Sequence, residues 1–151
     1  MSLSFLLATW FGLGKLPKAP GTWGSLGALP FAWVMQSYGG PLALGIGFLV
    51  ICAIGWWSIS DFLHRWPGED PQEIVIDEVA GQWLVLLFVP PDLALYAIGF
   101  VLFRVLDITK PWPASWADGT LSGTAGVFLD DVLAAIYGAI AMALLVHYWW
   151  Q

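Results

Sequence analysis

The chain has 151 residues, a length typical of one domain. Hydrophobic residues make up 59% of it and charged residues only 11%, against about 45–50% and 25% in soluble domains. A water-soluble globule of this size cannot bury so much apolar surface, and the formal net charge of −6 argues against a nucleic-acid partner. We therefore expect a single membrane-embedded domain over residues 1–151.

The N-terminal third of the chain predicts a short segment and two membrane helices. Residues 1–14 are apolar but lack the basic residues and cleavage site of a signal peptide, so we expect an interfacial or re-entrant segment there. Residues 22–38 are apolar and end at a turn signal, Gly-Gly-Pro, at 39–41. Residues 41–60 carry no charge. These two stretches are long enough to cross a bilayer.

Three more apolar stretches follow in the rest of the chain. The first, 74–89, stops at a pair of prolines, and the second, 93–108, has Asp92 as a candidate helix cap. Residues 114–126 are rich in Gly, Ser and Thr and predict a loop, and residues 132–150 predict the last span. The predicted fold class is therefore all-α, an integral membrane bundle of about five transmembrane helices after the short N-terminal segment.

The basic residues fall on one side of this topology. If the N-terminal segment is cytoplasmic, the loops at 39–41 and 90–92 lie outside and those at 61–76 and 108–131 lie inside. Every Lys and Arg then lies on the cytoplasmic side or at its edge, as the positive-inside rule predicts. These residues are Lys15, Lys18, Arg65, Arg104 and Lys110. We therefore expect a charged site that faces the cytoplasm.

Three charged residues near the end of the fourth predicted helix share one helix face. Arg104, Asp107 and Lys110 follow an i, i+3, i+6 spacing. A carboxylate between two cations suits a phosphate or a metal ion. An ion-pair ladder within the helix, with Lys110 extended towards the interface, explains the same triplet, and the sequence leaves both interpretations open.

Two pairs of adjacent carboxylates complete the charged stretches. Asp77 and Glu78 form one pair, and Asp130 and Asp131 form the other. Neighbours on a helix point about 100° apart, so both members of a pair can line a cavity but only one faces a given partner well. Carboxylates 4 Å apart repel by roughly 4 kcal/mol at an effective dielectric constant of 20. Together with Asp107 they predict a Mg²⁺ site, because Mg²⁺ prefers oxygen ligands.

A glycine-rich stretch at 20–27 precedes the first predicted helix. Such a helix start offers backbone N–H groups and a positive dipole end to an anion. Thr22 and Ser25 add hydroxyl groups, and Lys15 and Lys18 stand upstream. Close helix packing through glycines three residues apart is the alternative interpretation. The candidate phosphate-binding residues are Gly21, Thr22, Gly24, Ser25, Lys15, Lys18, Arg104 and Lys110.

Four stretches of the chain resemble the phosphatidylglycerophosphatase A family, in the family's order and at its spacing. They are residues 20–25 (PGTWGS), 76–81 (IDEVAG), 103–113 (FRVLDITKPWP) and 126–134 (GVFLDDVLA). The resemblance extends from about Trp10 to Trp150. It implies a Mg²⁺-dependent enzyme of the bacterial inner membrane that removes the terminal phosphate of phosphatidylglycerophosphate and yields phosphatidylglycerol.

The expected mechanism uses the five carboxylates to hold one or two Mg²⁺, so that an activated water attacks phosphorus. A covalent aspartyl-phosphate on Asp107 or Asp77 is the open alternative. A small membrane transporter with a carboxylate-lined site is the alternative from another class. Such a protein would place its polar site near the bilayer midplane, whereas these charges gather at the helix ends. The sequence makes no prediction of oligomeric state.

Overall fold

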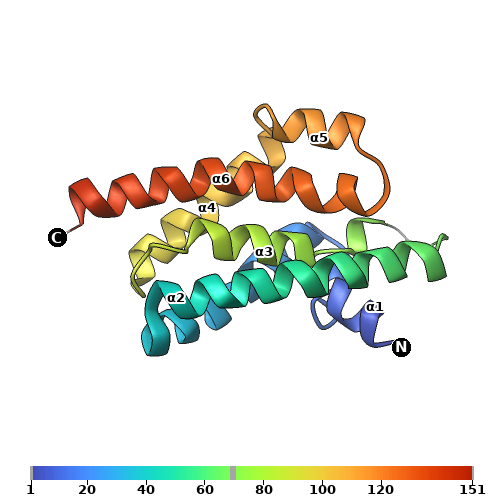
Figure 1. Cartoon of the computed structure of the whole chain (residues 1–151), viewed down its shortest axis with the longest axis horizontal. Helices are drawn as coiled ribbons and strands as arrows, with labels where there is room; N and C mark the ends of the chain where they lie inside the picture. Colours follow the sequence, from blue (N-terminus) through green and yellow to red (C-terminus); the bar gives the residue numbers. More distant parts are fainter. Residues whose placement is uncertain (1, 69–70, 151) are drawn as a thin grey trace.

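The computed structural model describes residues 2–68 and 71–150, and the described chain consists of helices without strands. The predicted all-α class is confirmed. Figure 1 shows the bundle, with helices from different parts of the chain lying side by side. The α-helices are α1 (Leu3–Ala8), α2 (Pro20–Arg65), α3 (Ile76–Val85), α4 (Leu93–Thr109), α5 (Ala114–Thr120) and α6 (Gly123–Trp149), and the 3₁₀ turns are η1 (Leu13–Lys15) and η2 (Pro71–Glu73).

Helix α2 turns back on itself at the predicted Gly-Gly-Pro signal. Gly40 has φ 61° and ψ −158°, a conformation that glycine adopts without steric cost, and Pro41 starts the returning arm. The two arms run back along each other (Figure 1), and a Cβ on Gly47 would lie 2.6 Å from the sulfur of Met35. The predicted helices 22–38 and 41–60 are therefore the two arms of α2.

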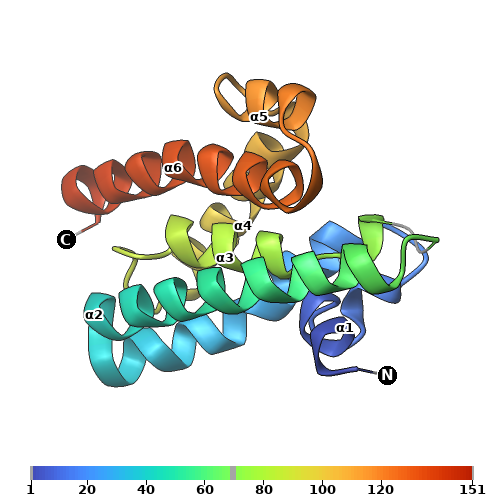
Figure 2. The ribbon, with the colours of Figure 1, turned by 45° about the vertical axis from the view of Figure 1, so that its right-hand side comes forward.

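Helix α3 is shorter than the predicted stretch 74–89. It has ten residues and so spans about 15 Å, half of a hydrocarbon core about 30 Å thick. It lies between α2 and α6, and most of its residues are buried (Figure 2). A helix that ends inside the bundle needs partners for its last carbonyl groups. Backbone N–H groups of Leu86 and Leu87 donate to the carbonyls of Gln82 and Leu84, and just beyond α3 the amide nitrogen of Gln36 donates to the carbonyl oxygens of Leu86, at 3.0 Å, and Leu87, at 2.8 Å.

In the C-terminal half of the chain, one predicted helix is confirmed, whereas the predicted loop 114–126 and the predicted start of the last helix at residue 132 are wrong. Helix α4 matches the predicted stretch 93–108, and Asp92 caps it by accepting from the N–H of Leu95 at 3.0 Å. The predicted loop 114–126 instead contains α5 and the start of α6. Burial of Ala114 and Ala117 in the α5 helix, which packs on α6, outweighs the loop-like composition.

The outer surface of the bundle is apolar. Helices α2 and α6 are long and apolar enough to cross a membrane, and only 28% and 33% of their most apolar windows are buried inside the molecule. Large side chains such as Leu42 and Leu49 are 75% and 67% exposed. Trp112 and Trp149, near opposite ends of the bundle, are exposed as in the aromatic belts of membrane proteins. An apolar surface of this extent indicates membrane association.

The connections between helices gather at two ends of the bundle. The turn at Gly40, the link from α3 to α4 and the C-terminus lie at one end, here called the far end (Figure 1). The end of α2, the turn η2 and the start of α6 lie at the opposite end, here called the site end. The loops predicted to share one side, 39–41 and 90–92, therefore lie at the far end, and those predicted to share the other side, 108–131 and the described residues of 61–76, lie at the site end (Figure 1).

Candidate active site

A cavity of about 610 Å³ opens at the site end. Its walls come from the starts of α2, α3 and α6, the end of α4, and α5. All five predicted carboxylates and two of the predicted cations line it, although they come from three separate helices. The charged lining residues are Asp77, Glu78, Arg104, Asp107, Lys110, Asp118, Asp130 and Asp131.

The charged triplet at the end of α4 forms ion pairs within that helix and also with α6. Asp107 accepts from Arg104, whose Nη1 lies 2.5 Å from Oδ2, and from Lys110, whose Nζ lies 3.3 Å from Oδ1. Lys110 also crosses to α6, where its Nζ lies 2.6 Å from Oδ2 of Asp130 and 3.6 Å from Oδ1 of Asp131. The lysine therefore turns into the cavity and does not extend towards solvent.

The position of Lys110 follows from the way α4 ends. Lys110 caps the helix in a left-handed conformation, φ 46°, and Pro111 cannot continue it. Burial lowers the pKa of Lys110, but the carboxylates of Asp131, Asp130 and Asp107 outweigh burial and hold this pKa above its ordinary value. Lys110 is therefore a fixed positive charge at neutral pH.

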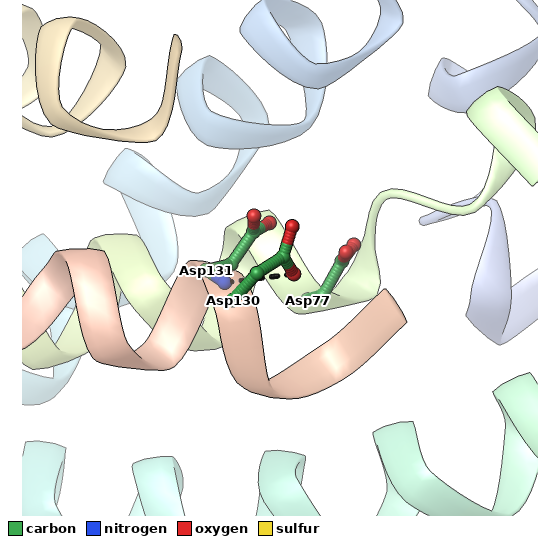
Figure 3. Close-up of side chains that lie close together, drawn as sticks. All are labelled: Asp77, Asp130 and Asp131. Carbon is green, nitrogen blue, oxygen red and sulfur yellow. Dashed lines mark hydrogen bonds between the residues drawn. The ribbon is translucent and has the colours of Figure 1, made fainter. Parts of the chain in front are cut away.

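The carboxylates form two groups that share one member. Asp77, Asp130 and Asp131 each offer an oxygen within 4.8 Å of the others, and so do Glu78, Asp107 and Asp131. Figure 3 shows Asp77 on α3 beside Asp130 and Asp131 on α6. The two members of the α3 pair thus belong to different groups, whereas Asp130 and Asp131 both belong to the first. Asp131 is common to both.

The carboxylate groups fit a divalent cation. Oδ1 of Asp77, Oε2 of Glu78 and Oδ2 of Asp131 are buried and have no hydrogen-bond partner in the described structure. A buried carboxylate oxygen without a partner is costly, and unit charges about 5 Å apart repel by roughly 3 kcal/mol at an effective dielectric constant of 20. Hard oxygen ligands of this kind suit divalent cations such as Mg²⁺ and Ca²⁺. Two nearby cations do not balance five carboxylates, whereas an added divalent ion would offset most of the excess.

The glycine-rich start of α2 serves mainly close packing. A Cβ on Gly21 would lie 2.7 Å from Oε1 of Glu78 and 3.1 Å from Nη1 of Arg104, and a Cβ on Gly24 would lie 2.7 Å from Cβ of Val75. Gly21 lines the cavity and leaves room for these two charged side chains. The other candidate phosphate-binding residues of this stretch, Thr22, Gly24 and Ser25, are not among the lining residues.

The two lysines upstream of α2 lie apart from the carboxylates. Lys15 lines a smaller pocket of about 200 Å³ beside the cavity, and its Nζ lies 4.9 Å from the centre of the Phe5 ring. Lys18 is exposed and is not among the residues that line the cavity. The structure therefore brings Arg104 and Lys110, but neither of these lysines, to the carboxylates.

Two polar residues in the cavity wall were not predicted from the sequence to belong to the site. Asp118 comes from α5, and Gln72 comes from η2. Asp118 lies within the stretch predicted as a loop, so no helical spacing tied it to the other carboxylates. Gln72 belongs to a polar loop whose path over the cavity depends on tertiary packing. Neither residue carried a local signal that could have placed it at the site.

Comparison with known proteins identifies the family. The sequence model of the family described as Phosphatidylglycerophosphatase A matches residues 6–146. The chain belongs to this family. Its identity to phosphatidylglycerophosphatase A of Escherichia coli K12 is 38%, covering 95% of this chain and 84% of that protein. Its identity to phosphatidylglycerophosphatase A of Haemophilus influenzae is 35%, covering 95% and 88%.

Another relative carries a different name, and the comparison with solved structures gave no match. A protein of Bacteroides thetaiotaomicron, provisionally named as a phosphatidylinositol-3-phosphatase, is 36% identical over 94% of this chain and 92% of its own length. No solved structure matches the chain.

Family membership confirms the predicted enzyme class. The chain is a membrane-associated phosphatase, a phosphoric monoester hydrolase, and the transporter alternative receives no support. Three of the stretches that carried the resemblance, 76–81, 103–113 and 126–134, supply seven of the charged residues of the cavity. The fourth, 20–25, supplies Pro20 and Gly21 to its wall.

Proposed function

We propose that the enzyme hydrolyses the terminal phosphomonoester of phosphatidylglycerophosphate to give phosphatidylglycerol and phosphate. The observation that carries this proposal is the convergence of five carboxylates and two cations on one cavity at the site end, in a chain of this family. In this proposal the cavity receives the lipid headgroup while the acyl chains stay in the bilayer. The proposed location is the bacterial inner membrane with the cavity facing the cytoplasm, which follows the positive-inside rule.

We further propose that the enzyme depends on Mg²⁺. The residues that would hold the ion are Asp77, Glu78, Asp107, Asp130 and Asp131, and the sharing of Asp131 by both carboxylate groups allows one ion or two. When bound, Mg²⁺ neutralises phosphate oxygens and makes water a better nucleophile at neutral pH. Support for a cation comes from the buried oxygens without partners in these same groups.

The remaining steps use groups of the chain itself. Lys110 and Arg104 are placed to bind the oxygens of the phosphomonoester through charge-assisted hydrogen bonds. Lys110 can stabilise charge in the transition state because it remains protonated at neutral pH. A carboxylate of the cavity accepts a proton from the water that attacks phosphorus, the P–O bond to the glycerol oxygen breaks, and this oxygen takes up a proton to give phosphatidylglycerol. If Asp107 or Asp77 attacks phosphorus instead, phosphate becomes trapped on that aspartate in single turnover, and this result would exclude direct attack by water.

The decisive assay is phosphate release from phosphatidylglycerophosphate by the purified full-length protein, with and without Mg²⁺. We expect activity only with Mg²⁺, and large losses in Asp130→Ala, Asp77→Asn and Lys110→Ala. Asp61→Asn is the matched control. Asp61 accepts a hydrogen bond from Ser4, forms an ion pair with Arg65, and is not among the residues that line the cavity. Full activity in EDTA, or unchanged rates in all three cavity variants, would overturn the proposed metal site.

The name of the Bacteroides relative suggests a second candidate substrate, phosphatidylinositol 3-phosphate. Both lipids carry a phosphomonoester at the end of a headgroup that extends from the bilayer, so the charged cavity alone does not choose between them. We expect phosphatidylglycerophosphate to be preferred, because two of the named relatives act on it according to their names. Parallel measurement of kcat/KM for both lipids tests this preference.

A further inference from the structure

An apolar groove runs between α2 and α4 on the membrane-facing surface, and it leads away from the charged cavity. The groove has a volume of about 480 Å³. Helix α2 contributes Leu26, Leu29 and Trp33 to its walls, and helix α4 contributes Leu93, Ala97 and Phe100. We call it the α2–α4 groove.

The groove and the cavity lie on the same face of α4. The positions 93, 97 and 100 of the groove and 104 and 108 of the cavity follow spacings of three and four residues, which place them in one stripe of the helix. Phe100 is one turn, about 6 Å, from Arg104 along the axis. The groove therefore lies next to the cavity along α4, one helical turn from Arg104.

Two contacts between α2 and α4 show how these helices are aligned beside the groove. At the cavity, a Cβ on Gly21 would lie 3.1 Å from Nη1 of Arg104. At the other end, the rings of Trp33 and Tyr96 meet edge to face with their centres 5.2 Å apart. The groove extends along α4 from Leu93 to Phe100, and Phe100 is its lining residue on α4 nearest to Arg104.

We infer that the α2–α4 groove holds an acyl chain of the lipid whose phosphomonoester lies in the cavity; this inference rests on the proposed function. The groove has the required polarity, the required direction from the site end into the bilayer, and a wall shared with the cavity. Lipid tails are as apolar as the groove, so occupancy gains little hydrophobic free energy. The groove acts by orienting the substrate, which fixes the phosphate against the carboxylates.

The test fills the groove without changing the charged cavity. Ala97 is exposed and lines the groove, so Ala97→Phe narrows it. Ala141→Phe is the matched control, because Ala141 is also exposed on a membrane-facing helix, α6, and does not line the groove. Phosphate release is measured with two forms of phosphatidylglycerophosphate, one with long (dioleoyl) chains and one with short (dihexanoyl) chains.

We expect Ala97→Phe to lower kcat/KM for the long-chain lipid by about tenfold through misplacement of the phosphate. The value for the short-chain lipid should change much less, and Ala141→Phe should leave both values unchanged. Phe100→Ala, which widens the groove, provides a second variant and should also weaken the preference for long chains. Equal losses on both lipids, or the same behaviour in Ala97→Phe and Ala141→Phe, would overturn the inference.

A binding measurement separates this inference from the proposed reaction. Phosphatidylglycerol carrying a photoreactive diazirine near the end of one acyl chain is cross-linked to the purified protein, and the labelled peptides are mapped. We expect labelling of residues 26–33 and 93–100, reduced in Ala97→Phe and retained in Ala141→Phe. Equal labelling of α6 would refute acyl-chain binding in the α2–α4 groove. This outcome does not depend on whether the enzyme releases phosphate from phosphatidylglycerophosphate.

Discussion

Two sets of buried polar groups, one near each end of the bundle, differ in whether they have hydrogen-bond partners. At the far end, Gln36 donates to the carbonyl oxygens of Leu86 and Leu87, so the end of α3 is satisfied inside the protein. At the site end, carboxylate oxygens of Asp77 and Glu78 are buried without a hydrogen-bond partner in the described structure. Neutral groups such as the hydroxyl of Tyr96 and the amide of Gln82 are also buried without a partner among the described residues, but the unpaired oxygens at the site end belong to clustered carboxylates, which cost more to bury. We propose that these carboxylates bind a ligand, so changes at the site end should lower activity and changes at Gln36 should lower stability.

The largest expected effect belongs to Asp131, which both carboxylate groups share. Asp131→Asn should lower kcat for phosphate release by roughly 10³-fold, comparable to the loss of a key electrostatic group in other enzymes. Its unfolding temperature in EDTA should be equal to or above that of the wild type, because the substitution removes repulsion between buried carboxylates. Thermal unfolding in detergent and the phosphate assay check both values. An Asp131→Asn protein that loses activity because it unfolds would contradict the assignment of Asp131 to ligand binding.

Addition of Mg²⁺ should stabilise the site end. A ligand that binds only the folded protein stabilises it by about 2.7 kcal/mol at one hundred times its dissociation constant. We expect the unfolding temperature of the wild type to rise with Mg²⁺ concentration and to fall back with EDTA. The rise should be lost in Asp131→Asn and retained in Asp61→Asn. A rise of the same size in Asp131→Asn would place the ion elsewhere.

A smaller effect is expected from Gln36→Leu at the far end. The substitution removes two hydrogen bonds: the carbonyl of Leu87 loses its bond from Gln36, whereas the carbonyl of Leu86 still accepts from the N–H of Val89 at 3.0 Å. Polar contacts inside membrane proteins contribute about 0.6–2 kcal/mol, so a loss of that size in unfolding free energy is expected. Activity per folded molecule should stay close to that of the wild type. A loss of activity in the fully folded variant would show that the far end also positions the site.

The fold could be predicted from the sequence where the signal is local. The turn at Gly40 follows from a Gly-Gly-Pro signal, and the limits of α4 follow from Asp92 and Pro111. The length of α3 could not be predicted in this way, because Gln36 lies 50 residues before the carbonyl of Leu86 that it binds. The start of α6 was also missed, since it depends on packing against α5.

For the site as well, contacts within one helix could be predicted from the sequence, whereas contacts between helices could not. The spacing of Arg104, Asp107 and Lys110 placed them on one face, and the structure brings them together. The bond from Lys110 to Asp130 crosses from α4 to α6, so helical spacing alone left open whether this lysine faces the site or the interface. Lys15 is close to the glycine-rich stretch in sequence, but its Nζ lies over the ring of Phe5 in a pocket beside the cavity, which sequence proximity could not predict.

The smallest expected effect comes from the two lysines before α2, which the sequence grouped with the phosphate-binding residues. Lys15 lies in the smaller pocket and Lys18 is exposed, so water and salt screen both charges from the carboxylate groups. Lys15→Ala with Lys18→Ala should therefore change kcat/KM by less than about threefold, a free-energy change within the range of exposed charge interactions. Lys110→Ala in the same assay gives the contrast. A double variant as inactive as Lys110→Ala would mean that these lysines reach the phosphate when the lipid is bound, and the cavity would then extend over η1.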